Sequence, residues 1–114
     1  METTTTAERT NEEWLADLRA EGSRQEAALE DLRLYLRRGL FSFLRDHHRD
    51  SDRGDLQDQG QQAEDFAQEA LLKVLDGLYT FRGESRFTTW AMKIAVRTAV
   101  SALRRAMYRD LSLD

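Results

Sequence analysis

The last third of the sequence concentrates positive charge, which suits an anionic partner. Residues 79–109 hold seven lysines and arginines against a single acid, Glu84, although the whole chain has a net charge of −4. The seven are Arg82, Arg86, Lys93, Arg97, Arg104, Arg105 and Arg109. Such a local excess favours contact with nucleic-acid phosphates. The alternative is a solvated helix face, which is the better interpretation of Arg109.

A second polar group lies between residues 65 and 73. Asp65, Gln68, Glu69 and Lys73 are spaced three and four apart, so a helix would place them on one surface patch. Leu72 among them would supply an apolar anchor within a charged rim, as protein interfaces do. A solvated helix face is again the alternative.

No motif in the sequence indicates catalysis or a bound metal. The chain has no cysteine, and it contains no nucleophile–base signature or phosphate-binding loop. The stretch 50–55 is only superficially similar to a calcium loop, because Gly54 stands where a third ligand is required. His47 and His48 are adjacent and make a poor chelating pair. We therefore expect no enzyme, no metal and no cofactor.

Helices are predicted to position these groups. The chain has no proline and only 6 glycines, and it is rich in strong helix formers. Apolar residues recur at helical spacing in four segments. These segments are 12–20, 24–46, 63–79 and 87–108. The fold class predicted is all-α, a bundle of three main helices with a short extra N-terminal helix.

The remaining segments are predicted as loops and ends. We expect a disordered tail at 1–10, one folded domain at 11–109, a polar mobile loop at 47–62 and the start of an interdomain linker at 110–114. Within the domain, Gly39 is expected to allow close helix contact, and Ser85 to cap the last helix. Trp90 falls on the apolar Phe87–Ile94 face and is expected in the core. No apolar run is long enough to span a bilayer, so no membrane insertion is expected.

Three blocks in fixed order carry a family resemblance. The first is Asp-Phe-Ala-Gln-Glu-Ala-Leu-Leu, from Asp65. The second is Phe-Arg-Gly-Glu-Ser-Arg-Phe-Thr-Thr-Trp, from Phe81. The third is Lys-Ile-Ala, from Lys93, followed by Leu-Arg-Arg. Together they resemble region 2 of the extracytoplasmic-function group of the sigma-70 family, over about 40 residues.

The resemblance implies a role in transcription initiation in the bacterial cytoplasm. The first block would dock on the clamp of the largest subunit of core RNA polymerase, through Asp65, Gln68, Glu69, Leu72 and Lys73. An anti-sigma factor is a further expected partner. Family members usually carry a second domain that reads the minus-thirty-five element, and no such pattern follows residue 109.

The resemblance also implies binding of promoter DNA. The loop would help to hold a flipped base of the non-template single strand at the minus-ten element, and the last helix would contact the strand. The residues implied are Phe81, Arg82, Gly83, Glu84, Ser85, Arg86, Thr89, Lys93, Arg97, Ser101 and Arg104. A base extruded from a duplex needs a pocket, hydrogen bonds and nearby cations, which this loop could supply.

Two positions depart from the family pattern. Arg97 stands where asparagine is common, and Ser101 stands where an acid is common, so we expect an unusual minus-ten sequence. Two alternatives stay open. One is a helical adaptor that binds an acidic partner or an anti-sigma factor without reading DNA. In the other, the acidic N-terminal half packs against the basic surface and masks it.

Overall fold

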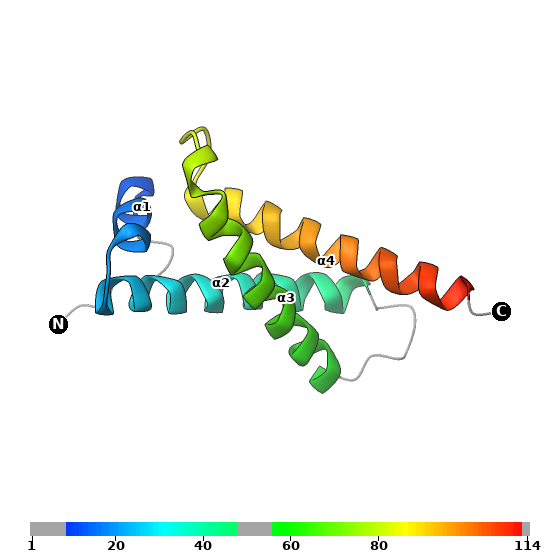
Figure 1. Ribbon diagram of the computed structural model, residues 1–114. Helices are drawn as coiled ribbons and strands as arrows, with labels where there is room; N and C mark the ends of the chain where they lie inside the picture. The colour runs from blue at the N-terminus through cyan, green and yellow to red at the C-terminus, as the bar shows by residue number, and fades with distance from the viewer. Residues whose placement is uncertain (1–8, 48–55, 113–114) are drawn as a thin grey trace.

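The structure is a computed structural model that describes residues 9–47 and 56–112. Its elements are α1 (Asn11–Arg19), α2 (Ser23–His47), α3 (Leu56–Asp76), the short 3-10 helix η2 (Leu78–Thr80) and α4 (Phe87–Ser112). No strand occurs among the described residues. The predicted all-α class, with three main helices and a short extra one, is confirmed (Figure 1).

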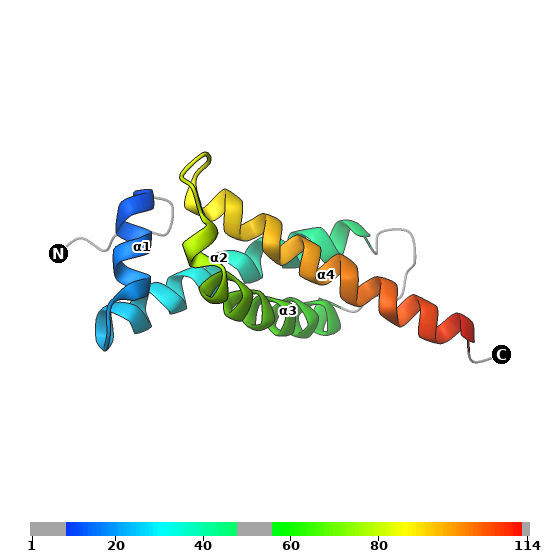
Figure 2. The same cartoon turned by 45° about the horizontal axis from the view of Figure 1, so that its top comes forward.

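The core is a row of leucines set against small residues. Helix α2 buries a leucine once per turn, at Leu32, Leu36, Leu40 and Leu44. Helices α3 and α4 both pack on α2 and also on each other (Figures 1 and 2). They face the core mainly with small residues: Ala63, Ala67, Ala70, Val74, Ala91, Ala95 and Ala99. Large side chains on one helix and small ones on its neighbours let the helices approach closely at native packing density.

Gly39 lies where α2 passes close to the Met92 side chain of α4. A Cβ atom at this position would lie 2.9 Å from Met92 Sδ and closer still to Met92 Cε. Ordinary van der Waals contact begins at 3.4 Å. The expectation that Gly39 allows close helix contact is confirmed.

Helix α1 is fastened to α2 by both apolar and ionic contacts. Trp14 and Leu18 are buried, as the sequence predicts for this face. Arg9 forms ion pairs with Asp17 (3.0 Å) and Asp31 (2.9 Å), and its guanidinium lies 4.6 Å from the centroid of the Trp14 ring. Thr10 caps α1 in a reciprocal capping box with Glu13.

The chain ends and the long loop differ from the prediction. The predicted disordered tail 1–10 reaches too far, because Arg9 and Thr10 are held by the contacts above; residues 1–8 lie outside the described part. The predicted loop 47–62 is also too long, since α2 includes residue 47 and α3 starts at Leu56. Gly60 lies inside that helix even though glycine costs about 1 kcal/mol there relative to alanine. Burial of the apolar face of α3 that begins at Ala63 outweighs the local preference.

The predicted start of an interdomain linker at 110–114 stays a prediction, and its first three residues are helical. Helix α4 continues to Ser112, and residues 113–114 lie outside the described part. No proline or glycine follows residue 83 to end the helix earlier.

Candidate nucleic-acid interface and docking surface

The residues predicted to dock on a protein partner lie together on the outer face of α3. Asp65, Gln68, Glu69, Leu72 and Lys73 are all exposed. Leu72 stands out because 69% of its surface is accessible, which is unusual for a large apolar side chain in a helix with a well-formed buried face. Lys73 Nζ lies 3.5 Å from Glu69 Oε2, so the patch is partly neutralised around Leu72.

Glu64 supports this patch from its inner edge. Its carboxylate accepts hydrogen bonds from Gln68 Nε2 at 2.7 Å and from Arg33 Nη1 at 2.6 and 2.7 Å. The bond from Gln68, followed by the charge and hydrogen bond of Arg33, holds the pKa of the Glu64 carboxyl below its usual value. The pair ties α3 to α2 and fixes Gln68 in the patch. Sequence reasoning missed this role, because residues 31 apart give no periodic signal.

The loop between η2 and α4 wraps around an aromatic cluster. Phe81 is half-buried, and its ring centroid lies 5.4 Å from that of Phe87 and 5.1 Å from that of Trp90. Gly83 has a φ of +79°, which glycine adopts without strain. Phe81 therefore anchors the loop, while Arg82, Gly83, Glu84 and Arg86 stay exposed.

A cavity of about 380 Å³ opens between this loop and α4. Trp90 stacks at a tilt on Phe87 with centroids 5.5 Å apart, as expected of a core residue, yet it also lines this cavity. Arg82 and Lys93 contribute cations to the lining, and backbone and hydroxyl groups contribute hydrogen-bonding capacity. The remaining lining residues are Thr80, Phe81, Glu84 and Ser85.

The exposed face of α4 continues from this cavity. Thr89, Lys93, Arg97, Ser101 and Arg104 are all exposed, as the helical spacing predicts. A second cavity of about 440 Å³ lies between α2 and α4 and is lined by Tyr35, Thr89, Met92, Lys93, Val96 and Arg97. Lys93 lines both cavities and Arg97 lines the second, so positively charged side chains of α4 lie beside both openings.

The first turn of α4 is capped by a residue from a different helix. Asn11 Oδ1 accepts a hydrogen bond from the Phe87 backbone N–H at 2.7 Å. Ser85, the predicted cap, instead donates its hydroxyl to the Arg86 carbonyl at 3.1 Å. The prediction is wrong because a tertiary contact supplies the acceptor that the local sequence was expected to supply.

Comparison with known proteins gives one family and two relatives. A model of the sigma-70 region 2 family matches residues 32–108. The chain belongs to this family. The sigma family is non-enzymatic, in agreement with the absence of a catalytic motif from the sequence.

This sigma region 2 domain also resembles two curated proteins. It is 49% identical over 43 residues to the RNA polymerase sigma-H factor of Pseudomonas aeruginosa. The matched segment covers 38% of this chain and 22% of that protein. It is 36% identical over 80 residues to the RNA polymerase sigma factor YlaC of Bacillus subtilis, which covers 68% of this chain and 40% of that protein. The chain thus spans less than half the length of the relatives it matches. No solved structure gives a significant match.

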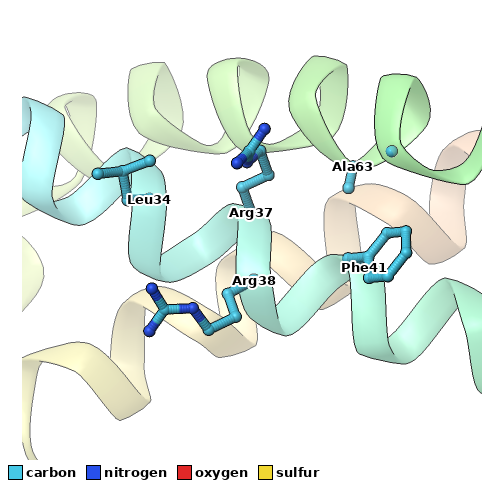
Figure 3. Close-up of a pocket in the computed structure, with 6 residues that line it drawn as sticks. Leu34, Arg37, Arg38, Phe41 and Ala63 are labelled. Atoms are coloured by element: carbon cyan, nitrogen blue, oxygen red, sulfur yellow. The ribbon is translucent and has the colours of Figure 1, made fainter. Parts of the chain in front are cut away.

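A further cavity of the sigma region 2 domain lies between α2 and α3. It measures about 300 Å³ and is lined by Leu34, Arg37, Arg38, Phe41, Gly60 and Ala63. Figure 3 shows Arg37 extending toward α3 and Arg38 directed away from it. Phe41 and Leu34 provide apolar walls beside these two cations.

The sigma region 2 domain shows neither a metal site nor a membrane span in its described ranges. Within residues 9–47 and 56–112, no three potential ligands among His, Asp and Glu cluster around a common point. Within the same ranges, no helix combines the length and the apolar character that crossing a membrane requires. The stretch 50–55, weighed as a calcium loop, lies outside the described residues.

Proposed function

We propose that this domain acts in transcription initiation by docking on core RNA polymerase and capturing the non-template strand of the minus-ten element. Docking uses the α3 patch of Asp65, Gln68, Glu69, Leu72 and Lys73 against the clamp of the largest subunit. Strand capture uses the loop from Phe81 to Arg86 and the cations of α4.

One observation carries the strand-binding half of the proposal. The cavity between the loop and α4 has an aromatic wall at Trp90, cations at Arg82 and Lys93, and a volume of about 380 Å³. Sites for unstacked bases combine stacking surfaces, hydrogen-bonding edges and phosphate-binding cations. Binding an unstacked base lowers the free energy of the open promoter, offsetting about a few kcal/mol of unstacking. No cofactor is needed for such a mechanism.

The docking half rests on the exposed Leu72. An apolar side chain within a polar rim is the usual anatomy of a protein interface. Replacing Leu72 with alanine should weaken binding to core polymerase about tenfold, since truncating an interface anchor costs upward of about 1 kcal/mol. Met107, which is 55% exposed on α4, provides the matched control, and Met107→Ala should bind normally.

The strand-binding half is tested with a fluorescent single-stranded minus-ten oligonucleotide in the presence of core polymerase. Lys93→Ala should weaken binding, because Lys93 lines both cavities of α4. Arg19→Ala removes the same charge from the last turn of α1 and should have little effect. Equal behaviour of the two variants would refute the proposed strand site.

A second function is supported by the cavity between α2 and α3. Its combination of Arg37, Arg38 and Phe41 suits an acidic peptide with an apolar anchor. An adaptor that binds an acidic partner, such as an anti-sigma factor, without reading DNA would use this cavity. Such an adaptor would lose partner binding in Arg37→Ala, because the Arg37 side chain lines the cavity and extends toward α3. It would bind no minus-ten strand in any form.

A further inference from the structure

Asn11 joins the two sides of the junction between the 81–86 loop and α4. Its Nδ2 donates to the Ser85 carbonyl at 3.0 Å, and its Oδ1 accepts from the Phe87 N–H at 2.7 Å. Both bonds span more than 70 residues of sequence and are partly buried. A single amide side chain therefore clamps the last residues of the loop to the start of α4.

Asn11 is itself held firmly. It is the first residue of α1, directly after the Thr10 of the capping box. One turn later, Trp14 stacks on Phe87 with ring centroids 5.4 Å apart and is 1% exposed. Arg9 fastens this end of α1 to α2 through Asp31. The backbone at Asn11 is thus held by the packing of α1, so the amide reaches the junction from a fixed position.

The clamp acts on a wall of the cavity between the loop and α4. Glu84, Ser85 and Trp90 line that cavity, and Asn11 binds the carbonyl of one of them. Within the loop, the Ser85 hydroxyl bonds only to the adjacent Arg86 carbonyl, which does not connect the loop to another element. The matched family residues, 32–108, do not include α1.

We propose that Asn11 is a positioning residue for nucleotide capture, setting the 81–86 loop in its binding conformation before the strand arrives. This inference rests on the strand-binding function proposed above. A loop ordered in advance loses less conformational freedom on binding, so the clamp raises affinity without touching the nucleotide.

The variant Asn11→Asp separates positioning from simple helix capping. A carboxylate still accepts from the Phe87 N–H and suits the positive end of α4, so the cap and the stability of the fold are kept. It cannot donate to the Ser85 carbonyl and instead repels it. If Asn11 only caps α4, Asn11→Asp will bind the minus-ten strand as the wild type does.

The matched control is Gln25→Glu. Gln25 Nε2 donates to the Leu18 carbonyl at 2.9 Å, another partly buried bond from an amide to a carbonyl, at the far end of α1. Gln25→Glu adds the same charge and breaks the same kind of bond without touching the loop. The 114-residue protein is used throughout, with core polymerase and the fluorescent minus-ten strand.

The expected result is an affinity for the strand about tenfold lower in Asn11→Asp, equal to about 1.4 kcal/mol, and changed less than about twofold in Gln25→Glu. Polymerase binding should be unchanged in both. Backbone ¹⁵N order parameters at residues 83–86 should fall in Asn11→Asp alone, which reports loop order directly.

Failure of the inference is distinguishable from failure of the proposed function. Wild-type strand affinity in Asn11→Asp, together with weakened binding in Lys93→Ala, overturns the positioning role and leaves the strand site standing. Unchanged order parameters at residues 83–86 overturn it as well. A wild-type domain that binds no strand overturns both.

Discussion

The contact between Gly39 and Met92 predicts that one mutation loses its usual stabilising effect. In an exposed helix interior, replacing glycine by alanine stabilises a protein by about 1 kcal/mol. Here the new Cβ would lie 2.9 Å from Met92 Sδ, so the sulfur must move by about 0.5 Å to reach ordinary contact, and the terminal methyl must move further. Both atoms belong to the far end of a flexible thioether side chain, which can shift, so the overpacking costs about 1 kcal/mol, the low end of the usual range. Gly39→Ala should therefore leave the stability of the domain nearly unchanged.

Truncating the partner side chain removes the clash. In a Met92→Ala background, Gly39→Ala should regain its helix-propensity benefit and stabilise the domain by about 1 kcal/mol. The coupling energy between the two sites is then about 1 kcal/mol, within the range seen for residues in direct contact. Met92→Ala alone should cost up to about 2 kcal/mol, since Met92 is only half-buried.

The measurement is urea unfolding of the four proteins followed by far-UV circular dichroism. Stabilities are compared at a common m-value, and the effect of Gly39→Ala on the unfolded chain cancels between the two backgrounds. If Gly39→Ala changes stability equally in both backgrounds, the contact with Met92 has no effect and the described approach of α2 to α4 is incorrect.

Three further predictions concern charged groups. Glu64→Gln should lower stability by about 1–2 kcal/mol at pH 7 by breaking the ion pair with Arg33. Because the pKa of Glu64 is lowered in the folded state, this difference is fully present above the ordinary carboxyl pKa. In unfolding measurements it should be lost as pH falls from that value through the lowered pKa of the folded state. Arg9→Ala should cost about 2–3 kcal/mol in urea unfolding, because its side chain is 10% exposed and serves two carboxylates. Arg24 also pairs with Asp17, but its side chain is 63% exposed, so Arg24→Ala should cost less than about 1 kcal/mol. Equal losses of stability in Arg9→Ala and Arg24→Ala would contradict the described burial of Arg9. Lys93→Ala should reduce the slope of log K against log salt for strand binding by about 0.7, and an unchanged slope would exclude a phosphate contact at Lys93.

The sequence predicts helices and faces well because both depend on local periodicity. The leucine row of α2 and the start of α4 at Phe87 follow from spacing and turn signals, and the structure confirms them. The predicted docking and strand-binding residues fall on exposed faces or in the loop, with Phe81 and Ser85 half-buried. Their assigned roles stay predictions.

The sequence does not reveal contacts between segments that are far apart along the chain. Asn11 caps α4 and Glu64 pairs with Arg33, and neither partner is a neighbour in sequence. The start of α3 differs from the prediction for a related reason. Gly60 reads as a loop signal, whereas burial of the next turns of α3 against α2, at Ala63, Ala67 and Ala70, makes the helix favourable there. Local propensity is a weak guide where tertiary burial decides.

The buried alanines of α4 and its exposed face differ in how far they tolerate substitution. Ala91, Ala95 and Ala99 are fully buried, whereas Arg97 and Ser101 lie on the opposite, exposed face of the same helix. Substitutions at exposed helix positions typically change stability by less than about 0.5 kcal/mol. The exposed face therefore tolerates many combinations of residues, while the buried alanines keep the helix in place. In a domain arranged this way, a new binding preference can arise without a compensating change in the core.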